Sequence, residues 1–86
     1  MSAMERIDLV ARFRELASEI AERDFSGIGE DTLIADLGLD SLSTLELVGC
    51  FERELDLYVP SEELADVTHV RDLLSLLRGK LGQRAA

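Results

Sequence analysis

The stretch "DLGLDSLSTLEL", residues 36–47, joins a loop rich in Gly, Asp and Leu to an amphipathic helix. We expect this helix to begin at Asp40 or Ser41, because both residue types favour a helix N-terminus, and to run to about Leu55. One arc of its helical wheel is mostly apolar and should be buried: Thr44, Leu47, Val48, Phe51 and Leu55. The opposite arc mixes apolar and charged residues and should face solvent: Leu42, Leu45, Glu46, Gly49, Glu52 and Arg53.

A further helix is expected before this one. Ser2 and Glu5 have the spacing of a capping box, and the helix should end near Asp24. Four apolar residues recur at intervals of three and four, which indicates one buried face: Leu9, Phe13, Leu16 and Ile20. The long connection that follows contains Phe25 and Ile28, so we expect it to pack onto the core.

Two helices are expected after residue 59. "PSEELAD" predicts a short one with Ser61 as its cap, and Thr68 should cap the last. The last helix has a regular apolar stripe: Val70, Leu73, Leu74 and Leu77. Gly79 is a natural helix end, which would leave residues 79–86 as a flexible tail. The sequence therefore predicts one all-α domain over residues 1–86, a four-helix bundle with its core at about 2–78, a long first connection and a short third helix.

Composition limits the kinds of partner. The chain has 86 residues, 18 acidic against 9 basic, and a formal net charge of -9. Such an acidic body repels nucleic acid and anionic membranes and attracts basic protein surfaces. Cys50 is the only cysteine, so no internal disulfide can form, which fits a reducing compartment. No apolar run reaches the roughly 18 residues of a membrane span. We expect a soluble, cytoplasmic protein without a membrane span.

Several kinds of catalytic or metal site are excluded by the motifs. A hydrolytic triad is not indicated, because the chain has one histidine, His69, and "GLDSLS" lacks the G-x-S-x-G elbow. "DFSGIGEDTLIA" fails as a calcium loop, because Ile28 and Ala35 stand where oxygen ligands are needed. No Cys and His spacing suits zinc, and no P-loop is present. We predict no catalytic residues and no metal site.

Ser41 remains the residue to explain. At a helix N-terminus, free N–H groups and the helix dipole would stabilise a phosphate ester on its oxygen. The ordinary alternative is that Asp40 or Ser41 only caps the helix, which Asp and Ser do routinely. Local propensity alone favours the cap.

The signature "DLGLDSLSTLELV" resembles that of the acyl carrier protein family, the phosphopantetheine-bearing carriers of fatty acid, polyketide and related synthesis. The family's D-S-L core is found here as Asp40, Ser41 and Leu42. "FERELD", "VPSEE" and "VTHV" match later landmarks of the family in order.

The resemblance implies that a phosphopantetheinyl transferase moves 4'-phosphopantetheine from coenzyme A to Ser41, between Asp40 and Leu42. The arm's thiol would then carry acyl groups as thioesters, so the chain would be a non-catalytic, monomeric carrier. Its expected partners are an acyltransferase or ligase, a ketosynthase and tailoring enzymes with basic docking surfaces. The expected docking residues lie along the second helix: Asp40, Leu42, Leu45, Glu46, Gly49, Glu52 and Arg53.

Three positions depart from typical fatty acid synthase carriers. Ser43 and Arg53 stand where acids are common, and Gly49 stands where a larger apolar side chain is usual. These departures favour a carrier for polyketide or other secondary metabolism. A stand-alone aminoacyl or peptidyl carrier is the first alternative, and an acidic helical adaptor without a prosthetic group is the second.

Overall fold

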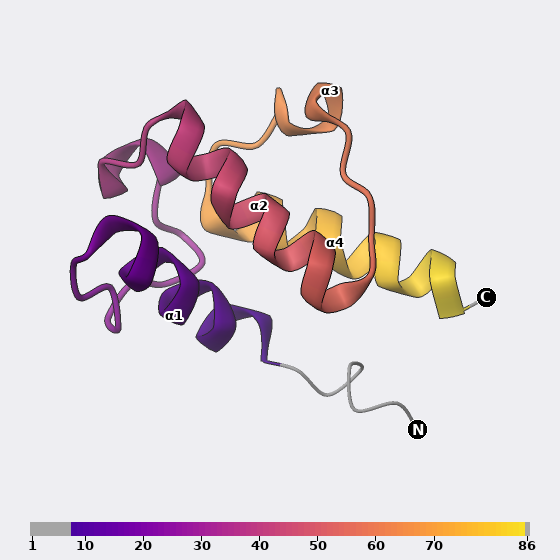
Figure 1. Ribbon diagram of the computed structural model, residues 1–86, viewed down its shortest axis with the longest axis horizontal. Coiled ribbons are helices and arrows are strands. Elements are labelled where there is room, and N and C mark those ends of the chain that lie inside the picture. Colours follow the sequence, from indigo (N-terminus) through magenta and orange to yellow (C-terminus); the bar gives the residue numbers. More distant parts are fainter. Residues whose placement is uncertain (1–7, 86) are drawn as a thin grey trace.

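Helices account for all the regular elements of the computed structural model, which describes residues 8–85. The elements are α1 (Leu9–Ala21), the 3-10 turn η2 (Ile34–Leu37), α2 (Ser41–Leu55), α3 (Ser61–Leu64) and α4 (Val70–Ala85). Helix α1 packs beside α2, and α2 passes in front of α4 in the view of Figure 1. The predicted all-α fold with a long first connection and a short third helix is confirmed.

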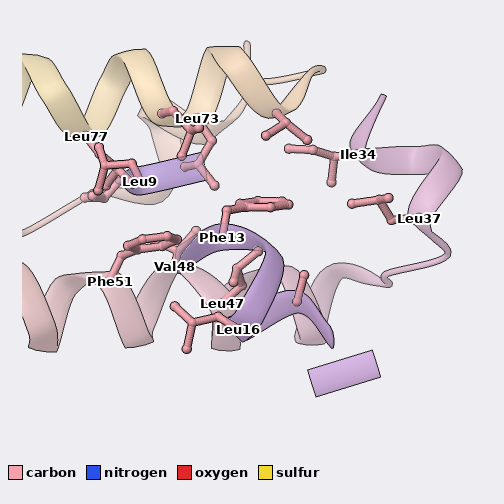
Figure 2. Packing of buried hydrophobic residues seen from close by; sticks show 14 of the residues in the cluster. Leu9, Phe13, Leu16, Ile34, Leu37, Leu47, Val48, Phe51, Leu73 and Leu77 are labelled. Atoms are coloured by element: carbon pink, nitrogen blue, oxygen red, sulfur yellow. The ribbon is translucent and has the colours of Figure 1, made fainter. Parts of the chain in front are cut away.

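The core consists of apolar side chains from all three long helices and from the loop (Figure 2). The predicted stripe of α4 is buried throughout, as are three of the four predicted residues of α1; Ile20 is half-buried. In α2 the predicted arc is buried except for Thr44, which is half-buried. The least exposed large side chains come from three helices: Phe13, Phe51, Leu47, Leu55, Leu73, Leu74, Leu77 and Val70.

Helix α1 is capped by Asp8, whose Oδ1 accepts from the Ala11 N–H at 3.2 Å. The capping box predicted at Ser2 and Glu5 lies outside the described residues. The helix ends at Ala21, close to the predicted end, because Glu22 takes the left-handed conformation with φ 54°. An ion pair links α1 to α2, in which Arg12 Nε and Nη2 donate to the two Glu54 carboxylate oxygens at 2.8 and 2.6 Å.

The long connection between α1 and α2 is fixed to the start of α4 by backbone hydrogen bonds. The Ile34 N–H donates to the Thr68 carbonyl, and the Val70 N–H donates to the Thr32 carbonyl, both at 2.9 Å. Phe25 is buried, so the predicted packing of this loop onto the core is confirmed. Its 3-10 turn, η2, was not predicted, because four residues are too few to show a helical period.

Three predicted helix ends are wrong. Pro60, not Ser61, is the N-cap of α3, since Ser61 is already its first helical residue and makes no capping hydrogen bond. At α4, Asp72 Oδ2 accepts from the Thr68 and His69 N–H groups at 3.1 and 3.0 Å, so Thr68 is a donor rather than the cap. Helix α4 continues through Gly79 to Ala85.

Candidate functional site

Ser41 is placed by a short turn between η2 and α2. Gly38 ends η2 with φ 75°, in the left-handed region that a residue with a side chain adopts only with strain. Asp40 is extended, and Ser41 is the first residue of α2. The left-handed Gly38 and the extended Asp40 therefore lead into α2 with Ser41 exposed at its start.

The cap of α2 is Asp40. Its Oδ1 accepts from the Ser43 N–H at 2.7 Å, and its carbonyl accepts from the Thr44 N–H at 2.9 Å. Hydrogen bonds from Ser43 hold the pKa of the Asp40 carboxyl below its usual range, with the larger effect from the backbone N–H and the smaller from the side chain. Among the described groups of residues 8–83 the Ser41 hydroxyl makes no hydrogen bond, so it is left accessible at the positive end of α2.

An open groove of about 580 Å³ begins at Ser41 and runs between the start of α2, the η2 segment and α3. Apolar side chains form most of its wall: Leu33, Ile34, Leu39, Leu45, Leu64 and Val67. A free hydroxyl at the positive end of a helix suits a phosphodiester, and an adjoining apolar groove suits an alkyl chain. The residues present therefore fit a 4'-phosphopantetheine arm on Ser41.

The predicted docking residues lie along α2, starting at the serine. Leu42 and Leu45 are 66% and 52% exposed despite being apolar, and Glu46 and Arg53 are exposed beside them. Gly49 is half-buried. These side chains share the face of α2 that the core leaves open, as the helical wheel predicts.

Glu52 differs from the other predicted docking residues. Its Oε2 accepts from the Val59 N–H at 2.8 Å, which holds the segment after α2 against the helix. Glu52 is half-buried. Its carboxylate therefore stabilises the fold, and its role in docking stays a prediction.

The remaining candidate groups form no second site. His69 Nδ1 lies 2.8 Å from Thr68 Oγ1, and Cys50 Sγ accepts from Arg53 Nη2 at 3.5 Å. In the described part of the chain, no group of three or more His, Cys, Asp and Glu side chains could hold a metal ion. None of the helices in residues 8–85 is both long and apolar enough to cross a membrane.

Residues 11–77 match the family described as "Phosphopantetheine attachment site". The chain belongs to this family. Its cofactor is therefore 4'-phosphopantetheine, and the chain is a non-catalytic carrier. The resemblance inferred from the D-S-L signature is confirmed at the level of the family.

Individual carriers and synthases are similar to the chain. It is 33% identical over 76 residues to an acyl carrier protein of Phenylobacterium zucineum, covering 87% of this chain and 96% of that protein. It is 38% identical over 69 residues to the bikaverin polyketide synthase of Gibberella fujikuroi, covering 80% of this chain. The crystal structure of an acyl carrier protein from Thermotoga maritima superposes with a TM-score of 0.84 at 34% identity, covering 98% of this chain and 99% of that one.

The matched synthases are far longer than this chain. The chain spans 3% of the length of the bikaverin synthase and 3% of the 3-methylorcinaldehyde synthase of Sarocladium schorii, to which it is 35% identical. It thus corresponds to one small segment of those synthases and to nearly the whole of a separate acyl carrier protein.

Proposed function

We propose that 4'-phosphopantetheine is attached to the Ser41 hydroxyl and that its terminal thiol carries acyl intermediates as thioesters. The observation that carries this proposal is the division of roles at the start of α2. Asp40 caps the helix, so Ser41 is accessible and its hydroxyl has no hydrogen bond among the described residues. A transferase needs only such a hydroxyl, because it brings its own catalytic groups and metal.

The test is intact mass after incubation with coenzyme A, Mg²⁺ and a broad-specificity phosphopantetheinyl transferase. We expect one pantetheinyl addition to the wild-type chain and none to Ser41→Ala. Ser61→Ala is the matched control, because Ser61 also lines the groove, and it should be modified normally. Addition to Ser41→Ala, or no addition with several transferases, would refute the assignment.

We further propose that the carrier serves polyketide or other secondary metabolism rather than bulk fatty acid synthesis. Matches to segments of the bikaverin polyketide synthase and the 3-methylorcinaldehyde synthase support this, as do Ser43, Gly49 and Arg53 on or near the exposed face of α2. Partners would be the transferase, an acyltransferase or ligase, a ketosynthase and tailoring enzymes. Its cytoplasmic location and monomeric state stay predictions.

The pathway is tested by measuring acyl transfer from the loaded carrier to a ketosynthase. We expect a fatty acid ketosynthase to use the acylated chain at least about tenfold less efficiently than a housekeeping carrier, through weaker docking. Equal rates would count against a dedicated pathway. Loading of amino acids by adenylating ligases, without loading of malonyl or other acyl groups, would instead favour the aminoacyl or peptidyl carrier. Family membership argues against an adaptor without a prosthetic group.

A further inference from the structure

The cation Arg53 differs from most other cations in the described part of the chain. Four of those others bind carboxylates: Arg12 binds Glu54, Arg71 binds Asp31, Arg78 binds Glu30 and Lys80 binds Glu63. Arg53 is exposed and forms no ion pair among the side chains of residues 8–83. In a chain with a net charge of -9, Arg53 is therefore an exposed positive charge that no carboxylate among these side chains contacts. Arg23 is also exposed without such a partner, but its guanidinium lies over the Phe25 ring.

The Arg53 side chain is held in place by the preceding turn of α2. Helical side chains lean towards the N-terminus, and Arg53 Nη2 reaches Cys50 Sγ at 3.5 Å. Its Nη1 would lie 3.7 Å from a Cβ built on Gly49. That distance is an ordinary van der Waals contact, so the guanidinium lies directly over position 49. The charge thus lies against the open face, and the bond to Cys50 Sγ is the one hydrogen bond that Arg53 donates from its side chain among the described residues.

The open face of α2 therefore has two charged ends. Near Ser41 the exposed charges are the carboxylates Asp40 and Glu46, whereas the far end presents the Arg53 cation. Glu52 beside it is half-buried and accepts from the Val59 N–H. Glu46 and Arg53 are seven residues apart, which is about 10 Å along a helix axis. The exposed Leu42 and Leu45 lie at the negative end. A uniformly basic surface would complement only half of this face.

We propose that the synthase enzymes that use this carrier bind α2 through a surface with a cation opposite Glu46 and a carboxylate opposite Arg53. This inference rests on the proposed function. A guanidinium presents parallel N–H donors that match a carboxylate. A bond between Arg53 and a partner carboxylate would therefore fix the position of the partner along α2. Enzymes with only basic docking surfaces are repelled at Arg53, which lowers their rate of association.

The test uses a phosphopantetheinyl transferase with a basic docking surface as the probe. Its surface cations are changed to Glu one at a time, and kcat/KM of loading is measured by intact mass at low salt. With the unaltered transferase, Arg53→Glu should load about three- to tenfold faster than the wild-type chain. One transferase variant should show the reverse order, loading the wild-type chain faster than Arg53→Glu.

Arg78→Glu is the matched control, because it makes the same charge change on α4, at an exposed cation that binds Glu30. It should alter loading less than twofold, since it leaves the open face of α2 unchanged. Equal effects of Arg53→Glu and Arg78→Glu, or the same order for every transferase variant, would overturn the inference while leaving Ser41 as the attachment site. A wild-type chain that is never loaded would refute the proposed function and this inference with it.

Discussion

At the level of single residues, Asp40 caps α2 and Ser41 keeps an accessible hydroxyl, whereas the sequence alone allows either residue to be the cap. Asp and Ser are both good N-caps, so propensity cannot choose between Asp40 and Ser41. The structure identifies Asp40 as the cap, because its carboxylate accepts a hydrogen bond from the Ser43 N–H. A related limitation applies at the start of α4, where Asp72 accepts from the Thr68 and His69 N–H groups. The first two N–H groups of this helix donate instead to the Thr32 and Glu30 carbonyls of the long connection. Capping side chains compete, and the outcome depends on backbone geometry.

Asp72 should make stability depend on acid pH. Hydrogen bonds from the His69 N–H, the Thr68 N–H and the Thr68 hydroxyl lower its pKa to about 2. Because the unfolded chain has a pKa of about 3.9, this contribution is present above about pH 4 and is lost as pH falls towards 2. In urea unfolding from pH 5 to 2, the advantage of wild type over Asp72→Asn should shrink below pH 4. A constant advantage would contradict this, and Asp66→Asn, an exposed control, should show none of the effect.

At the level of elements, periodicity predicts the long helices but not where they stop. Gly79 should end α4 by propensity, yet a helical glycine costs only about 1 kcal/mol. The residues beyond it recover that cost: Leu81 packs against the core, and Lys80 Nζ lies 2.8 Å from Glu63 Oε2 on α3. The sequence contains each of these residues but not their contacts, which join segments 17 residues apart.

The ion pair between Glu63 and Lys80 should hold α3 in place. The Lys80 side chain is 19% exposed and that of Glu63 is 37% exposed, so the pair is only partly screened by solvent. We expect Lys80→Met to lower the free energy of unfolding by about 1 kcal/mol and to speed amide exchange in residues 61–66. Arg78→Met, which breaks the more exposed pair with Glu30, should cost less than about 0.5 kcal/mol and leave this exchange unchanged. Unaltered exchange in Lys80→Met would show that packing alone fixes this wall of the groove.

At the level of the whole molecule, the composition and the stripes of apolar residues predict a helical bundle, whereas the contacts that align its parts are long-range. Arg12 and Glu54 are 42 residues apart, and Arg71 and Asp31 are 40 apart. In an acidic chain each arginine has many candidate partners, so only the fold selects the pair. The groove beside Ser41 was likewise not predicted, because its walls come from three separate segments.

The net charge of -9 should make the folded state sensitive to salt. Folding brings the like charges together, and salt screens their repulsion, so the melting temperature should rise by about 5 °C from low to moderate ionic strength. Mg²⁺ should act at lower concentration than Na⁺. The double variant Glu22→Gln, Asp66→Asn removes two exposed acids and brings the net charge from -9 to -7. This variant should have a higher melting temperature than wild type at low salt. Added salt should raise its melting temperature less, because less repulsion is left to screen. A melting temperature that is independent of salt, or equal gains in both chains, would show that this acidic surface is not destabilising.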